Sequence, residues 1–153
     1  MIAVIQRVNN ATVYADGELS GSIGKGLYIL LGVASSDSEN DAMLLAEKIS
    51  KLRIFSDENG KMNLSVMDVD GDIMVVSNFT LNANYSHGNR PDYFASAAPA
   101  EANRLYELFK ELLSPKTKHL ACGVFGADMR TEMSTDGPVT IVMDSNVLKG
   151  GKR

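Results

Sequence analysis

The chain has 153 residues, 44% of them hydrophobic, which suffices for one domain that buries its core without disulfide or metal staples. A formal net charge of -4 argues against binding along a nucleic-acid backbone, because each neutralised phosphate requires a Lys or Arg on the docking face. The single cysteine, Cys122, and the lack of a signal-like segment or a membrane-length apolar run predict a cytoplasmic protein.

The N-terminal part of the chain is predicted to form antiparallel strands. Residues 2–8 and 11–15 alternate apolar and polar side chains, as half-buried strands do. Asp16-Gly17 is typical of a tight hairpin turn into a further strand over residues 18–22. The nearly continuous apolar run over residues 27–33 indicates a strand buried on both faces.

The middle of the chain is predicted to alternate helix, strand and loop. Ser38 is a suitable N-cap for a helix whose apolar residues recur on one face: Ala42, Leu45, Ala46, Ile49 and Leu52. A short extended segment over residues 53–56 and a turn precede a buried strand over residues 72–79. Residues 82–98 lack a clear period and predict a long loop, which in a small domain is usually functional or disordered.

The last third is predicted as a helix followed by strands. Pro99 suits the first turn of a second amphipathic helix, and Pro115 ends it. Strands are then expected at residues 119–124, 127–133 and 139–143. A flexible basic tail is expected over about residues 146–153. The whole pattern predicts a single α/β domain over residues 1–153, with mixed, largely antiparallel, curved and barrel-like sheets and two main helices on one side.

The usual catalytic side chains are missing from recognisable motifs. His87 lies in a glycine-flanked loop and His119 at a strand entrance, so they form neither a nucleophile–base pair nor the short ligand spacing of a zinc site. Cys122 has small and apolar neighbours, which indicates an inert buried thiol. The residues therefore predict no metal and no cofactor.

Two polar segments at strand ends could instead present backbone groups to a substrate. Ser77-Asn78-Phe79-Thr80 closes one apolar strand, and Thr135-Asp136-Gly137-Pro138-Val139-Thr140 opens another. Backbone N–H and C=O groups aimed into a pocket stabilise an oxyanion and orient a substrate without a general base. Simple β-propensity explains the threonines equally well, and a Gly-Pro pair at a strand entrance is most often only a turn.

Separated segments along essentially the whole chain carry a likeness to one family. They are Met1-Ile2-Ala3-Val4-Ile5-Gln6-Arg7-Val8, Arg53-Ile54-Phe55-Ser56 with Gly60-Lys61-Met62-Asn63, Ser77-Asn78-Phe79-Thr80-Leu81, Gly88-Asn89-Arg90-Pro91, Phe125-Gly126-Ala127-Asp128-Met129 and Asp136-Gly137-Pro138-Val139-Thr140. Together they resemble the D-aminoacyl-tRNA deacylase family. Asn78 stands where the family usually has Gln, and Thr135 where its Gly-Pro motif usually begins with Asn; both departures concern the geometry of the pocket rather than the class of reaction.

The resemblance implies a homodimer of deacylase-like fold that hydrolyses D-aminoacyl-tRNA, and glycyl-tRNA, to free amino acid and tRNA. It also implies a cis Gly137-Pro138 bond that enters the active site of the other subunit, where both carbonyls accept hydrogen bonds from the substrate's α-amino group. A D side chain then points outward, whereas an L side chain meets the backbone and is rejected.

The resemblance also assigns roles in the pocket. Backbone N–H groups near Phe79 and Thr80 stabilise the oxyanion, and the substrate's ribose 2′-hydroxyl helps to activate water, without metal or cofactor. The other roles fall to Ser77 and Asn78, which shape the pocket, to Phe125 and Met129, which line the adenosine site, and to Arg7, which holds the Gly-Pro loop.

Three alternatives stay open on the sequence alone. A non-catalytic nucleic-acid-binding dimer is favoured by the basic tail and disfavoured by the acidic net charge. A small-molecule esterase is the second. The third is covalent catalysis by Thr80, although no base lies near this residue in the sequence.

Overall fold

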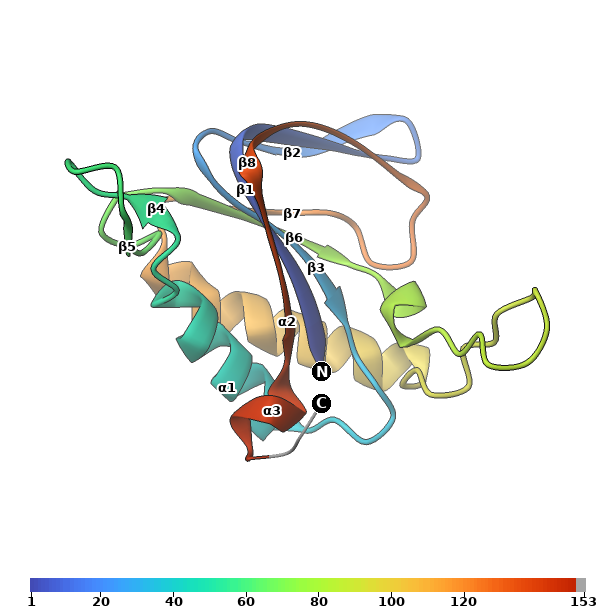
Figure 1. The fold of residues 1–153 in the computed structure, drawn as a ribbon. Helices are drawn as coiled ribbons and strands as arrows, with labels where there is room; N and C mark the ends of the chain where they lie inside the picture. Colours follow the sequence, from blue (N-terminus) through green and yellow to red (C-terminus); the bar gives the residue numbers. More distant parts are fainter. Residues whose placement is uncertain (151–153) are drawn as a thin grey trace.

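The computed structural model describes residues 1–150, in which six strands form one mixed, curved sheet (Figure 1). These strands are β1 (Ile2–Ala15), β2 (Glu18–Ile23), β3 (Gly26–Gly32), β6 (Asp72–Ser77), β7 (Leu120–Cys122) and β8 (Met129–Asp144). A second, two-stranded sheet joins β4 (Phe55–Ser56) to β5 (Met62–Leu64). Helices α1 (Glu39–Ser50) and α2 (Pro99–Leu113) cover the same face of the large sheet. None of the helices formed by residues 1–150 has the length and apolar character needed to cross a bilayer.

The large sheet is organised around β1. This strand pairs antiparallel with β3 through residues 2–8, with β2 through residues 11–15, and with β8 along nearly its whole length. Strands β3, β6 and β7 are parallel to one another. Because β1 pairs with β3 along its first half and with β2 along its second half, the sheet curls toward a closed barrel. The predicted fold class is confirmed.

The structure corrects the predicted strand boundaries in β1 and β8. The sequence pattern divides each of them into two strands, but each is continuous. The two halves of β8 both pair with β1, so the chain does not reverse at Asp136-Gly137. Instead Gln6 pairs with Thr140 and Val8 with Thr135, and residues 136–139 bulge out opposite Arg7.

Local signals at the ends of elements are confirmed. Asp16 and Gly17 both have positive φ, 49° and 84°, as the tight turn between β1 and β2 requires. Ser38 precedes α1, and the Asp41 carboxylate accepts hydrogen bonds from the N–H and hydroxyl of Ser38 at 2.9 and 3.0 Å. Pro99 is the first residue of α2.

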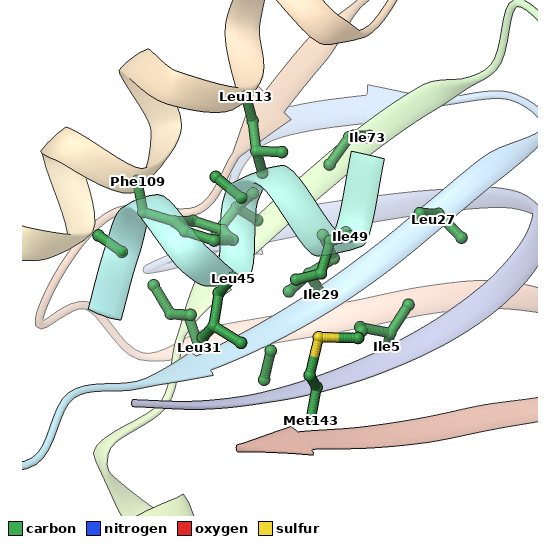
Figure 2. Packing of buried hydrophobic residues seen from close by; sticks show 14 of the residues in the cluster. Ile5, Leu27, Ile29, Leu31, Leu45, Ile49, Ile73, Phe109, Leu113 and Met143 are labelled. Carbon is green, nitrogen blue, oxygen red and sulfur yellow. The ribbon is translucent and has the colours of Figure 1, made fainter. Parts of the chain in front are cut away.

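The main core lies between the sheet and the two helices (Figure 2). Its members come from α1, α2 and the facing side of the sheet: Leu45, Ile49, Phe109, Leu113, Ile5, Leu27, Ile29, Leu31, Ile73 and Met143. Side chains alternate between the two faces of a strand, and those on the other face, such as Tyr28 of β3 and Met74 of β6, form a second cluster. Both faces of β3 are therefore apolar, as its sequence predicts.

A buried carboxylate holds the C-terminal helix α3 (Ser145–Leu148) against α1. The Ser145 hydroxyl donates to Asp41 Oδ1 at 2.5 Å, and Lys149 Nζ lies 2.7 Å from the same oxygen. The prediction of a flexible tail from about residue 146 is thus corrected for residues 146–150, because these contacts hold the segment against α1. The remainder of that prediction, residues 151–153, lies outside the described residues.

Replacing Asp41 by Asn should lower the unfolding free energy by about 2–4 kcal/mol at pH 7. Burial raises the pKa of Asp41, but hydrogen bonds from Lys149, Ser145 and Ser38 outweigh burial and hold this pKa well below its usual range. The stabilisation is therefore complete above the unfolded-state pKa of about 4 and is lost as the pH falls below it. Urea unfolding of both proteins at pH 7 and pH 3 measures the effect.

The difference between wild type and Asp41→Asn should shrink at pH 3, and an equal difference at both pH values would contradict the assignment. Glu58→Gln is the matched control, because Glu58 is exposed in the turn between β4 and β5. That variant should unfold like the wild type at both pH values.

Candidate active site

The chain turns sharply at the end of β6. The predicted strand reaches residue 79, but β6 ends at Ser77 and a short 3-10 helix, η1 (Phe79–Asn82), follows. The cause is Asn78, whose Oδ1 accepts hydrogen bonds from the Thr80 N–H at 3.2 Å and from the Thr80 hydroxyl. Gly32 lets η1 approach β3, since a Cβ at that position would lie 2.9 Å from the Cβ of Leu81.

Two cavities share this turn as a wall. The larger has a volume of about 440 Å³ and the smaller about 340 Å³. Ser77, Asn78, Phe79 and Gly126 line both. The rest of the larger cavity is mostly apolar: Leu31, Val33, Tyr93, Ser96, Ala97, Pro99, Ala102, Tyr106 and Phe125. The structure thus brings three of the predicted site residues, Ser77, Asn78 and Phe79, together at the wall that both cavities share.

The loop between η1 and α2 forms the outer wall of the larger cavity. The Tyr93 ring contacts the Phe79 ring edge to face, with centroids 5.0 Å apart, and the Ser96 hydroxyl donates to the Phe79 carbonyl at 3.2 Å. Ser96 also forms a β-bridge with Ala34. Sequence reasoning missed Tyr93 and Ser96 as site residues; the aperiodic loop that holds them was the available signal.

Phe125 and Met129 lie in different cavities. Phe125 lines the larger one, beside the Tyr106 ring, with centroids 6.0 Å apart. Met129 lines the smaller one, which Tyr28 also lines. Burial raises the pKa of both Tyr106 and Tyr28, so both phenols are neutral at physiological pH. The Tyr106 hydroxyl donates to the Val75 carbonyl at 3.0 Å, and this bond fixes the floor of the larger cavity.

The backbone donors of the turn differ in availability. The Thr80 N–H already donates to Asn78, whereas the Phe79 N–H is the first donor of η1 and has no acceptor inside that helix. The Thr80 side chain is exposed and its hydroxyl donates to Asn78. Thr80 lines neither cavity. The geometry therefore favours the Phe79 N–H over the Thr80 hydroxyl as a group that meets a ligand.

Gly137 and Pro138 lie apart from both cavities of their own chain. The bond between them is cis, as the resemblance implies, and both residues are exposed. The bulge is anchored by Arg7, whose Nε donates to the Asp136 carbonyl and lies 3.1 Å from Asp136 Oδ2. A second Arg7 nitrogen donates to the Ile54 carbonyl at 2.5 Å.

The sheet register explains this separation. The bulge faces Arg7, which pairs with Leu27, whereas Ser77 pairs with Leu31 near the other end of β3. The four residues from Leu27 to Leu31 correspond to about 13 Å along β3. Strands β8 and β6 are also three strand spacings apart across the sheet. The two predicted segments therefore do not meet within one chain.

The two histidines and the cysteine also lie outside the cavities. His87 and His119 are exposed. Cys122 is half-buried, with Lys110 Nζ 3.8 Å from its sulfur. Among residues 1–150, no three His, Cys, Asp or Glu side chains gather as a metal-binding set.

Comparisons with known proteins agree along the whole chain. The family model described as D-Tyr-tRNA(Tyr) deacylase matches residues 4–144. A D-aminoacyl-tRNA deacylase of Caldicellulosiruptor saccharolyticus is 51% identical over 95% of this chain and 97% of its own length. One of Anaeromyxobacter dehalogenans is 50% identical over 97% of this chain and 99% of its own.

Two solved structures share the fold. The c-Myc DNA Unwinding Element Binding Protein superposes with a TM-score of 0.88 at 38% identity, over 94% of this chain and 98% of its own. A probable eukaryotic D-amino acid tRNA deacylase superposes with a TM-score of 0.81 over 93% of this chain and 97% of its own; at 12% identity it supports the fold alone.

Proposed function

This chain belongs to the D-aminoacyl-tRNA deacylase family, and from that premise we propose that it hydrolyses the ester bond between a D-aminoacyl group and tRNA. The products are the free D-amino acid and tRNA, and the proposed location is the cytoplasm. The observation that carries the proposal is the turn over residues 77–79, which forms a wall of both cavities and supplies a backbone donor without an acceptor in its own helix.

In the proposed reaction, water attacks the ester carbonyl and the carbonyl oxygen becomes an oxyanion. The bond between the carbonyl carbon and the ribose oxygen then breaks, and the leaving oxygen takes a proton. The Phe79 N–H donates to the oxyanion, as preorganised backbone donors do in acyl transfer. Among the described residues no histidine lines either cavity, and the substrate's ribose 2′-hydroxyl takes the role of assisting the water.

The complete site forms in a homodimer. Gly137 and Pro138 of one subunit enter the larger cavity of the other, where their carbonyls accept hydrogen bonds from the α-amino group of the substrate. Support comes from the exposed position of both residues and from the anchoring of their bulge by Arg7. The distance between this bulge and the cavity of its own chain also supports a site that combines two subunits.

Chirality is then read by the main chain. Once the α-amino group is held, a D side chain points away from the backbone and an L side chain collides with it. Glycyl-tRNA has no side chain to exclude and is also a substrate. The side chain of the amino acid makes no required contact, so a range of D-aminoacyl groups is accepted.

Release of D-tyrosine from D-Tyr-tRNA, with L-Tyr-tRNA as the matched substrate, tests the activity. We expect hydrolysis of the D-ester at least about a hundredfold faster than that of the L-ester, because backbone collision costs several kcal/mol. Equal cleavage of both esters, or cleavage of neither, would overturn the proposed function. Cleavage of p-nitrophenyl acetate at a comparable rate would favour a small-molecule esterase.

Replacing Thr80 by Ala should leave kcat for D-Tyr-tRNA within about tenfold of wild type, because the Thr80 hydroxyl donates to the Asn78 side chain and Thr80 lines neither cavity. Single-turnover kinetics measures the effect. A loss of turnover to background in a folded variant would show that the hydroxyl is the nucleophile. Thr80→Ser restores the hydroxyl and serves as the control.

Nucleic-acid binding without catalysis is the second candidate function. It is favoured by the likeness to a protein named as a DNA-unwinding-element binder at 38% identity. Electrophoretic mobility shifts with DNA duplexes, alongside the hydrolysis assay, separate the two. Tight duplex binding without hydrolysis would favour this candidate.

A further inference from the structure

The loop between η1 and α2 carries two unusually exposed aromatic rings. Phe94 is 91% exposed and Tyr85 80%, more than any other large apolar side chain among residues 1–150. Aromatic residues make up only 7% of the chain. Exposed rings of this size give up the free energy that their burial would contribute to folding. Two such rings on one loop therefore indicate a binding surface.

Ordered backbone holds both rings. Asn84 and Asp92 exchange two backbone hydrogen bonds of 2.9 Å, which close the loop into a short hairpin. Tyr85 follows Asn84 directly. The Asp92 carboxylate accepts from the Asn84 side chain at 3.1 Å and from the Phe94 N–H at 3.3 Å. The rings are thus presented from a braced hairpin.

The hairpin continues directly into the wall of the larger cavity. Phe94 is flanked by Tyr93, which packs on Phe79, and Ser96 donates to the Phe79 carbonyl. Figure 1 shows this loop projecting from the body of the protein beside η1. The two rings therefore lie on a segment adjoining the cavity wall, where a polymer whose end occupies the cavity can meet them.

The hairpin presents one cationic side chain to solvent. Arg90 and His87 lie exposed near its tip, and within the described part of the chain no carboxylate pairs with Arg90. The carboxylate of its one acidic residue, Asp92, keeps its charge but accepts hydrogen bonds from the Asn84 side chain and the Phe94 N–H instead of pairing with Arg90. Exposed rings beside a cationic side chain are the combination by which proteins bind single-stranded nucleic acid.

We propose that Tyr85 and Phe94 stack on the unpaired nucleotides that precede the terminal adenosine of the tRNA, with Arg90 against their phosphates. The inference rests on the proposed function, which places the terminal adenosine in the cavity. Unpaired RNA fits better than a second copy of this chain, because the hairpin leads into the wall of the larger cavity and its Arg90 has no carboxylate partner among residues 1–150.

The test compares a long and a short substrate in the double variant Tyr85→Ala/Phe94→Ala. With D-Tyr-tRNA we expect KM to rise by about tenfold per ring and kcat to stay within twofold, since base–aromatic stacking contributes to binding alone. With 2′(3′)-O-D-tyrosyl adenosine, which lacks the preceding nucleotides, kcat/KM should stay within about twofold of wild type. Leu19→Ala, at an exposed position on β2, is the control and should change neither value.

Three results would overturn the inference. An unchanged KM for D-Tyr-tRNA would show that the rings do not contact RNA, and an equal loss with both substrates would place them at the reacting ester. A shift from dimer to monomer in sedimentation would assign them to a subunit interface. Failure of the wild type to hydrolyse either D-ester would instead refute the proposed function, so the two failures are distinguishable.

Discussion

Two inactive variants, Gly137→Ala and Phe79→Pro, should regain about a quarter of wild-type hydrolysis when their subunits are exchanged in equal amounts. The reason is that half of the dimers are then mixed, and each mixed dimer holds one intact site and one doubly altered site. Alone, Gly137→Ala should lose about a hundredfold or more in kcat/KM for D-Tyr-tRNA, because the bulge no longer fits the cavity of its partner.

The geometry at Gly137 explains why alanine is a severe change there. The residue has φ of +150°, and a Cβ would lie 2.3 Å from the backbone nitrogen of Val139 and 3.0 Å from its side chain. The bulge must shift to relieve this contact, although the exposed position keeps the loss of stability small.

The exchange experiment has an internal control. Phe79→Pro mixed with Ala102→Trp, which fills the larger cavity, should regain nothing, because each lesion lies at the larger cavity of its own subunit and no mixed dimer keeps an intact cavity. Mass spectrometry of differently tagged chains confirms that exchange has occurred. Exchange without any regain of activity for Gly137→Ala with Phe79→Pro would show that the site does not combine two subunits.

Phe79→Pro should by itself lower kcat by about 10²–10³, the usual cost of removing one oxyanion donor. Proline deletes the N–H of the first helical residue, a position where the helix tolerates it. Asn78 before it already has extended rather than helical backbone, φ -147° and ψ 93°, so a following proline requires only an increase of ψ toward the preferred range of about 120–160°. No hydrogen bond inside η1 is lost.

Phe79→Ala separates the donor from the ring. This variant keeps the N–H and loses the contact with Tyr93, so kcat should fall by less than about tenfold. Pre-steady-state hydrolysis of D-Tyr-tRNA gives kcat, and thermal unfolding confirms that both variants are folded. Equal losses in the two variants would exclude the Phe79 N–H as the oxyanion donor.

The features that sequence predicted well depend on neighbours a few residues away. Asp16-Gly17 adopts the positive φ values of a hairpin, and Ser38 and Pro99 mark the starts of the two long helices. Each effect arises from backbone sterics or from a hydrogen bond within one turn, so the local sequence contains the necessary information. The alternating and continuous apolar runs likewise defined the two faces of β3.

Long-range pairing explains what the sequence did not predict. The break at Asp136-Gly137 looks like a turn, but β8 is held straight by β1, more than a hundred residues away, and the excess residues become a bulge. The predicted flexible tail is fixed over residues 146–150 by Asp41 of a distant helix. Tyr93 and Ser96 became site residues only because their loop packs on Phe79.

By itself, the sequence determined the class of fold, the starts of the helices, and the two segments, residues 77–80 and 135–140, that matter for the proposed chemistry. Only the tertiary structure decided that these segments lie apart in one chain and that Arg7 anchors the bulge. It also decided that the Thr80 N–H donates to Asn78, whereas the Phe79 N–H has no acceptor within η1. The physical reason is that strand register and side-chain contacts between distant residues set the direction of each group, and local propensity carries no information about them.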